Sequence, residues 1–296
     1  MATRLLIILV FLLPLRSLAG EQATPSFALR WRTQLPAPAV EPIALSRQGL
    51  VYVLGSDGKL RAVDSLGRIL WEYPAVGKLP PTYPSNLMAA PDGSAIVAAG
   101  TNIYSISSSG QELWKASVGE QSPHWLSKVA CSDTGLIFCA SRSLVAIDSS
   151  GKIVWKLFEN QIKDEGHSDI AVHGSLIFFA VSNILHKIST DGVLIKSQQL
   201  PHTKIFGLSV IDGEHLLAAV RDDPRGVTGF SKIDSDLSEV WFYSLQGGDF
   251  GDSASVDPTG RVFVNNGDGV FAAIDKSGLS AWRRQTVGSQ AGGHPS

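Results

Sequence analysis

The sequence predicts an all-β fold, a β-propeller of four-stranded antiparallel blades. A tryptophan recurs at an almost constant spacing of about 40 residues, which is the signature of a repeated structural unit. Within each unit, short runs of alternating apolar residues are separated by turn residues, as in small antiparallel sheets. Beyond the N-terminal segment, no stretch has a sustained helical period. The repeated position holds Trp31, Trp71, Trp114, Trp155, Trp241 and Trp282, with Lys196 in the slot between Trp155 and Trp241.

Residues 1–19 are predicted to be a signal peptide, followed by a linker at 20–27 and the propeller domain at 28–296. A basic residue, Arg4, precedes the apolar run Leu5–Leu13, and small residues at the end of the segment suit a cleavage site. An uncleaved membrane anchor is the alternative, although the apolar run is short for a span. The chain is therefore expected to be secreted or periplasmic, with no transmembrane segment after cleavage.

The first half of each repeat is a predicted hairpin. In the first repeat, Ala44–Leu45 and Leu50–Val53 flank the turn Ser46–Gly49, and the last repeat has the same pattern around Asp257–Gly260. Each turn combines a residue that can cap the bend with a glycine that can adopt a positive φ. This hairpin supplies the two strands that open each four-stranded unit.

The second half of each repeat is a hairpin that ends at the recurring tryptophan. Val63–Trp71 recurs as Ile147–Trp155 and Ile274–Trp282, with Asp in the second position and Gly in the fifth. Weaker copies end at Trp114, Lys196 and Trp241. The glycines expected in these turns are Gly67, Gly110, Gly151, Gly192 and Gly278. A single blade cannot bury both faces of its sheet, so we expect each tryptophan to dock between neighbouring blades.

Three of these copies, which begin at Ala62, Ala146 and Ala273, read Ala-x-Asp-x-x-Gly-x-x-x-Trp. The pattern resembles the tryptophan-docking repeat of pyrroloquinoline quinone (PQQ)-like propellers, a family that includes quinoprotein alcohol dehydrogenases and the bacterial outer-membrane assembly propeller lipoprotein. The resemblance covers about residues 28–285 and six recognisable repeats. It implies a structural role for the tryptophans and turn glycines, since most proteins with this repeat lack the quinone. The chain departs from the lipoprotein in having no cysteine near the predicted cleavage site.

Two cysteines, Cys131 and Cys139, flank the turn Ser132–Gly135. In an oxidising compartment they could form a disulfide, and two small buried thiols are the alternative. If Cys131 faces a residue near position 136, Cys139 lies on the opposite face of the sheet, which favours the thiols. The vicinal cysteines that the resemblance to PQQ dehydrogenases would require near the cofactor are missing.

The connectors between blades carry the less repetitive residues and are the predicted ligand or partner face. Tyrosine, tryptophan, phenylalanine and histidine side chains occur near the point where a connector enters its blade. Such side chains suit a planar ligand, a sugar or an aromatic peptide side chain. Three histidines could also hold a metal, and the structural alternative is that these residues only cover the first strands. The predicted face comprises Tyr83, His124, Trp125, His167, Phe206, Phe250 and His294.

Composition and motifs exclude several function classes. With a formal net charge of −2 and no basic stripe, the chain is not expected to bind nucleic acid. It has no G-x-S-x-G, Walker or H-E-x-x-H motif, so no catalytic residue, metal site or cofactor is expected. The sequence predicts a non-catalytic scaffold that binds protein or extended peptide in the cell envelope. A quinoprotein oxidoreductase-type domain and a carbohydrate- or small-ligand-binding sensor module are the alternatives.

The number of blades is left open by the sequence. Trp31 marks a strand of the last type in a blade, but it precedes the first complete repeat, and six complete repeats follow it. Two architectures account for this: a fragment of a seven- or eight-bladed ring, or a six-bladed ring with a spare N-terminal strand. A fragment would expose unpaired sheet edges, which favour self-association.

Overall fold

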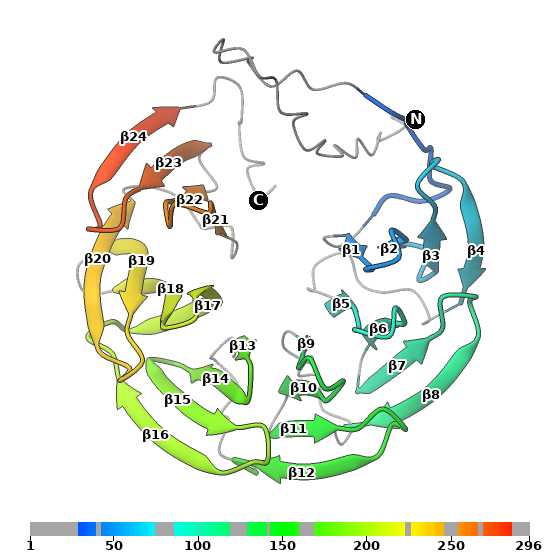
Figure 1. Ribbon diagram of the computed structural model, residues 1–296, viewed down its shortest axis with the longest axis horizontal. Coiled ribbons are helices and arrows are strands. Elements are labelled where there is room, and N and C mark those ends of the chain that lie inside the picture. The colour runs from blue at the N-terminus through cyan, green and yellow to red at the C-terminus, as the bar shows by residue number, and fades with distance from the viewer. Residues whose placement is uncertain are drawn as a thin grey trace, which may run out of the picture. The chain divides into compact units, whose positions relative to one another are not determined.

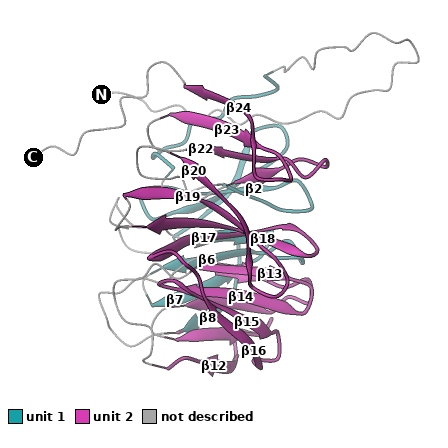
Figure 2. Ribbon diagram, turned by 90° about the vertical axis from the view of Figure 1, so that its left-hand side faces the viewer, with its two compact units in different colours: residues 1–117 teal, residues 118–296 magenta. Residues whose placement is uncertain are grey.

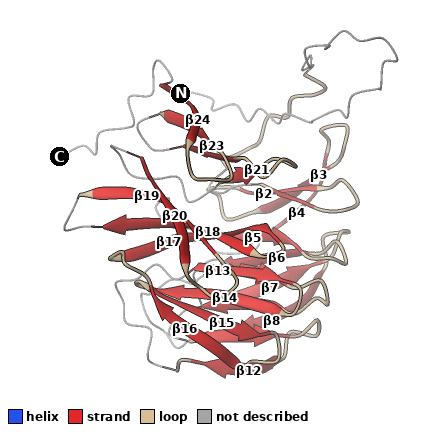
Figure 3. Ribbon diagram, turned by 60° about the vertical axis from the view of Figure 1, so that its left-hand side comes forward, coloured by secondary structure: helices blue, strands red, loops and turns tan. Residues whose placement is uncertain are grey.

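A computed structural model describes residues 29–39, 43–74, 86–99, 101–118, 129–140, 143–159, 169–222, 226–245, 254–265 and 269–285. All regular structure in these ranges is β-strand (Figure 3). Within them there is no helix long and apolar enough to cross a membrane. The predicted signal peptide and linker lie outside the described residues.

The strands form six four-stranded antiparallel sheets, each with its strands in chain order. The chain divides into two compact units, Met1–Ser117 and Val118–Ser296 (Figure 2). The first unit holds β1 (Ala44–Leu45), β2 (Val51–Leu54), β3 (Leu60–Val63) and β4 (Ile69–Tyr73), followed by β5 (Asn86–Ala89), β6 (Ala95–Ala99), β7 (Asn102–Ile106) and β8 (Glu112–Ser117).

The second unit holds the other four sheets. The third sheet is β9 (Val129–Cys131), β10 (Ile137–Ala140), β11 (Leu144–Ile147) and β12 (Ile153–Leu157), and the fourth is β13 (Asp169–His173), β14 (Leu176–Val181), β15 (Ile184–Ser189) and β16 (Leu194–Gln199). The fifth is β17 (Lys204–Asp212), β18 (His215–Asp222), β19 (Val227–Ile233) and β20 (Glu239–Leu245), and the sixth is β21 (Ser255–Val256), β22 (Val262–Asn265), β23 (Val270–Ile274) and β24 (Ser280–Gln285).

Burial explains why the middle and last strands of a sheet differ in sequence. All residues of β2, β6 and β10 are buried, because both faces of these strands are covered, and they are nearly continuous apolar runs. The last strands β4 and β12 alternate between half-buried and exposed residues. Within each unit, consecutive sheets therefore cover one another's middle strands and leave the last strand more exposed.

Apolar clusters join successive sheets within each unit. In the first unit, Tyr52 and Leu60 of the first sheet pack with Val97 and Ile106 of the second. In the second unit, three such clusters link the third sheet to the fourth, the fourth to the fifth and the fifth to the sixth. Figure 1 shows β13, β17 and β21 on the inner side of the arc that the second unit forms, and β16, β20 and β24 on its outer side. The predicted all-β fold of four-stranded antiparallel blades is confirmed.

The recurring tryptophan docks onto the turn glycine of the next sheet. The Trp71 ring lies against Gly110, whose φ is +86°, and a Cβ at Gly110 would lie 2.8 Å from that ring. Nε1 of Trp71 donates a hydrogen bond to the carbonyl of Ser108 in the same turn, at 2.9 Å. In the second unit the corresponding groups are Trp155, Gly192 and the Thr190 carbonyl, and Trp241, Gly278 and the Lys276 carbonyl. Glycine is required here both for its left-handed backbone and for the space that the indole fills.

The remaining repeat tryptophans have other surroundings. Trp31 packs against Gly67 and the apolar cluster of the first sheet. Trp114 lies in β8. Trp282, in β24, is 39% exposed, and its ring centroid is 6.1 Å from that of Phe263. Gly151 has a φ of +84° in the turn that follows β11.

The predicted relation between the two cysteines was wrong by one residue. Cys131 pairs with Ile137, so Cys139 lies two residues farther along the same face of the sheet, diagonal to Cys131. Diagonal neighbours in an antiparallel pair are about 7–8 Å apart, which is longer than a disulfide normally spans. Burial raises the pKa of the Cys139 thiol to about 12, which makes that thiol a poor nucleophile.

Candidate functional site

The described residues contain one member of the predicted ligand or partner face, Phe206. The others lie outside them: Tyr83, His124, Trp125, His167, Phe250 and His294. The connector that leads to Phe206 runs from Leu200 to Thr203, between the fourth and fifth sheets, and it is described in full. The candidate site is therefore built around this connector and the start of β17.

Backbone hydrogen bonds fix the connector at both of its ends. Leu200 donates its N–H to the carbonyl of Asn183 at 2.9 Å, and Ile205 donates its N–H to that of Ser182 at 2.7 Å. Thr203 donates both its N–H and its hydroxyl to the carbonyl of Arg221, each at 2.8 Å. The path into β17 is thus set by the fourth sheet on one side and by β18 on the other.

A β-bulge directs the Phe206 side chain. In the ladder between β17 and β18, Ile205 pairs with Val220 and Gly207 pairs with Ala219, so Phe206 is the extra residue with no partner across the pair. A bulge bends its strand and turns the side chain of the extra residue away from the regular alternation. The half-buried Phe206 also packs against the apolar cluster of the fifth and sixth sheets, which holds the ring in place.

Two cations lie over the ring of Phe206. Nζ of Lys204 is 5.8 Å from the ring centroid, and Cζ of Arg221 is 5.5 Å from it. Both distances are within the range of about 6 Å over which a cation is attracted to an aromatic face. Lys204 is the first residue of β17 and Arg221 is the last but one residue of β18, so two neighbouring strands supply the three side chains. The result is a half-buried spot that combines one aromatic ring with two positive charges.

A buried polar network holds the connector on its other side. Nε2 of His202 is 2.5 Å from Oε2 of Glu239, and the Ser231 hydroxyl donates to the same carboxylate oxygen at 2.6 Å. The His202 ring also contacts Phe242, with centroids 4.8 Å apart. His202 Nδ1 is buried and has no hydrogen-bond partner. We call His202, Ser231 and Glu239 the connector clasp, because they tie residue 202 to β19 and β20.

The connector clasp contains the residue types of a serine nucleophile relay, but its geometry differs from one. In a relay, the hydroxyl and the carboxylate bind opposite nitrogens of the imidazole. Here Oγ of Ser231 lies 3.1 Å from Nε2 of His202, the same nitrogen that contacts Glu239. Ser231 is also completely buried, so a substrate has no access to it. The arrangement suits a structural role in holding the connector.

Sequence reasoning did not identify the connector clasp. His202 follows the Lys196 slot by six residues, whereas the predicted sites were sought nine to twelve residues after each slot. Its partners, Ser231 and Glu239, lie 29 and 37 residues farther along the chain. The sequence signal was a histidine directly after Pro201 in a short connector. This signal does not indicate which residues the histidine contacts.

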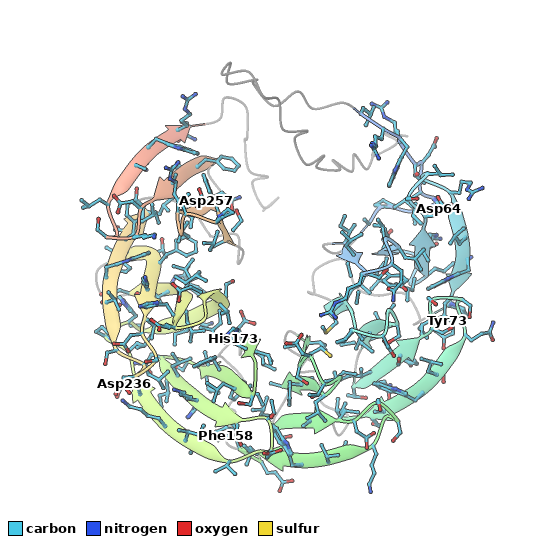
Figure 4. All side chains as sticks on the ribbon, in the orientation of Figure 1. Asp64, Tyr73, Phe158, His173, Asp236 and Asp257 are labelled. Atoms are coloured by element: carbon cyan, nitrogen blue, oxygen red, sulfur yellow. The ribbon has the colours of Figure 1, made fainter. Side chains whose placement is uncertain are left out.

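Several other carboxylates of the described residues have structural roles in turns or in ion pairs. Asp148 accepts hydrogen bonds from the Ser150 hydroxyl and the Lys152 backbone N–H, which lower its pKa. The same cause lowers the pKa of Asp257, which Figure 4 marks in the turn between β21 and β22. In the first sheet, the buried Arg61 binds Asp57 and Glu72. Among the described residues, no group of three or more histidine, cysteine or acidic side chains is placed to hold a metal.

Within each unit, four-stranded antiparallel sheets pack in chain order through apolar clusters, and Trp71, Trp155 and Trp241 dock onto the next sheet. Such sheets are the blades of a β-propeller. A protein-family model described as "Outer membrane protein assembly factor BamB" matches residues 24–125, about a third of the chain. No curated protein sequence matches the chain.

Solved structures show the same fold at low sequence identity. BamB from Moraxella catarrhalis has a TM-score of 0.65 and 17% identity, over 88% of this chain and 78% of that one. Virginiamycin B lyase from Staphylococcus aureus has a TM-score of 0.64 and 12% identity, over 83% of each chain. The WD40 β-propeller domain of Doa1 has a TM-score of 0.60 and 14% identity, over 85% of this chain and 83% of that one. Together with the family match, these likenesses support a PQQ-like β-propeller.

Proposed function

We propose that the chain is a secreted or periplasmic, non-catalytic β-propeller that binds protein or extended peptide in the cell envelope. The observation that carries this proposal is the spot at Phe206, where a bulge near the start of β17 presents an aromatic ring flanked by Lys204 and Arg221. Aromatic side chains and arginine are enriched among the residues that contribute most of the binding energy at protein interfaces. A half-buried, positioned cluster of this kind suits recognition of a partner.

The similarity in fold to BamB supports an interaction scaffold, because that protein is described as an assembly factor. The similarity to virginiamycin B lyase shows that the same fold also supports an enzyme. Fold alone therefore does not separate scaffold from enzyme. The site favours a scaffold, because the connector clasp lacks the geometry of a nucleophile relay.

Affinity capture from envelope extract tests the scaffold proposal. The chain from Gly20 onward serves as bait beside a Phe206→Ala variant, with bound proteins identified by mass spectrometry. We expect a discrete envelope protein that the wild type retains and the variant loses. An identical profile for both baits contradicts the proposal for this site. The intact mass of the exported protein tests the location, and it should begin at or near Gly20.

The quinoprotein alternative is tested separately by absorbance titration of the purified chain with PQQ in the presence of calcium. We expect no saturable complex and no dye-linked alcohol oxidation. A stoichiometric quinone complex would replace the scaffold proposal with the oxidoreductase alternative.

A further inference from the structure

Two lysine ammonium groups lie together where the fourth sheet meets the fifth. Lys187 of β15 and Lys196 of β16 are directly opposite each other across the antiparallel pair. Nζ of Lys187 donates to the carbonyl of Ser235 at 2.9 Å, and Nζ of Lys196 donates to the carbonyl of Asp236 at 2.6 Å. Two consecutive carbonyls of one turn, which Figure 4 marks at Asp236, therefore hold both ammonium groups over the same small area. We call Lys187 and Lys196 the lysine pair.

We propose that the lysine pair binds a doubly negative oxyanion, which is inorganic phosphate or the phosphate group of an ester. Two ammonium groups carry the two positive charges that such an anion requires. Lysine is a usual ligand of phosphate in proteins, where it acts as a compact point charge with rotatable donors. The inference goes beyond the scaffold function and does not depend on it.

The charges of the lysine pair are not neutralised by carboxylates. In the part of the chain that the structure describes, neither ammonium group forms an ion pair, and carbonyl oxygens are their partners. Other cations of the molecule are paired: Lys59 binds Glu72 at 2.8 Å, and Arg68 binds Asp64 at 2.7 Å. Like charges directly opposite each other in a sheet are destabilising. A dianion that contacts both lysines removes this repulsion.

The lysine pair has hydrogen-bond donors left for a ligand. An ammonium group has three N–H donors, and each lysine uses one of them on a carbonyl. Both lysines are half-buried, whereas Ser235 and Asp236 are exposed, so an ion reaches the pair from the side of the turn. Partial burial lowers the effective dielectric constant, which strengthens the attraction between the lysines and an anion.

The acidic residues of the turn limit the affinity for an anion. Oδ1 of Asp234 accepts the N–H groups of Asp236 and Ser238, each at 2.9 Å, so the turn itself uses this carboxylate. Among the described residues, the exposed carboxylate of Asp236 forms no ion pair with either lysine. Because its negative charge lies on the same turn as the carbonyls that hold the lysine pair, it opposes the binding of an anion.

The other candidate surfaces carry less. A shallow pocket of about 310 Å³ lies beside the turns of the sixth sheet and is lined by Arg261 and Lys276, but the carboxylate of Asp275 also lines it. Phe271 and Trp282 of the same sheet are 43% and 39% exposed, yet nothing in the structure indicates what covers them. The lysine pair instead combines two neighbouring positive charges with fixed positions.

Titration of the full chain with inorganic phosphate, followed by NMR of the backbone amides, tests the proposal. The ionic strength is kept constant with chloride, so that general screening does not change during the titration. We expect saturable shifts at Lys196 and Asp236 with a Kd on the order of 1 mM, as for two charge-assisted hydrogen bonds. Acetate, which has a single negative charge, should bind at least about tenfold more weakly.

Variants connect the binding to the lysine pair. Lys187→Met and Lys196→Met, made singly, should each weaken phosphate binding at least about tenfold. The control carries Lys152→Met and Lys156→Met, which remove two exposed lysines from the third sheet of the same unit and should leave the Kd unchanged. Asp236→Asn should tighten binding about threefold, a gain that a merely structural role of the lysines does not predict. Thermal unfolding without phosphate verifies that each variant is folded.

A parallel titration with glycerol phosphate distinguishes the two sources of the anion. Tighter binding of the ester assigns the site to a phosphate carried by a larger molecule, and tighter binding of inorganic phosphate assigns it to the free ion; both results support the proposal. Three results overturn it: no saturable shift up to about 20 mM phosphate, where a site of the expected affinity is nearly full, shifts centred away from the lysine pair, or equal weakening in the control variant.

Discussion

Leu237 lies in the turn between β19 and β20, at the position that glycine occupies in the turns that contact a tryptophan. Its φ is +61°, a left-handed backbone that is unfavourable for a leucine, and its side chain is completely buried. The preceding sheet has Lys196 in place of tryptophan, and its Nζ donates to the carbonyl of Asp236 at 2.6 Å (Figure 4). Two replacements therefore occur together: Lys196 replaces the tryptophan of the fourth sheet, and Leu237 replaces the glycine of the turn that this tryptophan would contact. The buried leucine supplies apolar volume that the lysine cannot.

The paired exchange predicts strong coupling between the two positions. Leu237→Gly relieves the left-handed backbone but empties a buried site, so we expect a loss of about 2–4 kcal/mol in the free energy of unfolding. Lys196→Trp alone should also destabilise, because Leu237 occupies the space of the indole. The double variant should recover at least about 1 kcal/mol relative to the sum of the single changes. Chemical denaturation of the four proteins measures the cycle.

Trp155→Ala provides the reference for this cycle, with an expected loss of about 3–5 kcal/mol from the cavity between the third and fourth sheets. Lys196→Ala should cost less than about 1 kcal/mol, as expected for a partly exposed charged group. Additive single and double changes at positions 196 and 237 would contradict the proposed compensation.

Among the elements, the hairpin formed by the last two strands of a sheet has one construction, which all six sheets share. A register shift precedes the turn in every sheet, for example between Ala146 and Ile147, and the turn closes with a residue of positive φ such as Gly151. This is a turn of type I followed by a bulge, which twists the hairpin. In four of the sheets an aspartate caps the turn, and it accepts two backbone N–H groups: Asp64, Asp148, Asp234 and Asp275.

These capped turns predict a loss of stability in acid. Hydrogen bonds from Ser150 and Ser277 to the carboxylates lower the pKa values of Asp148 and Asp275 in the folded state. A lowered folded pKa stabilises the fold at pH values above the unfolded pKa, about 4 for aspartate, and the contribution is lost as pH falls through the folded value. The free energy of unfolding should therefore be nearly flat between about pH 5 and pH 7 and fall below about pH 4.

Denaturant unfolding at several pH values checks this expectation. Asp148→Asn keeps an oxygen that can cap the turn but removes the titrating group, so its acid dependence should be shallower than that of the wild type. An exposed aspartate elsewhere, Asp191→Asn, serves as the matched control. An unchanged slope in the Asp148 variant would show that the turn carboxylates do not set the acid limit.

The sequence predicts the repeated elements well because their determinants are local or strictly periodic. The turn from Asp148 to Gly151 is encoded within four residues, and the partner of Trp155 follows from the repeat period. The candidate site depends on contacts without a period. The bulge at Phe206 is a property of the pairing of β17 with β18, and the connector clasp joins residues on three elements. Only the position of Phe206 at the entry to its sheet followed from counting along the chain.

In the molecule as a whole, the described residues form a repeated scaffold and include one connector between sheets, Leu200–Thr203, in full. The docked tryptophans and capped turns recur from sheet to sheet and account for the fold. The connector from Leu200 to Thr203 lies between the fourth and fifth sheets, where Lys196 replaces the docked tryptophan. It leads into the bulged strand β17 and is held by the connector clasp. We propose that the propeller binds a protein at this connector and the start of β17.

Site-specific photocrosslinking tests this claim most directly. A photoreactive phenylalanine analogue replaces Phe206 in one protein and Glu214 in the control. Glu214 is exposed in the turn that follows β17, whose end at Asp212 lies about 20 Å from Phe206 along the strand. After irradiation in envelope extract, we expect a discrete crosslinked protein from position 206 and none from position 214. Equal crosslinking from both positions, or from position 214 alone, would contradict it.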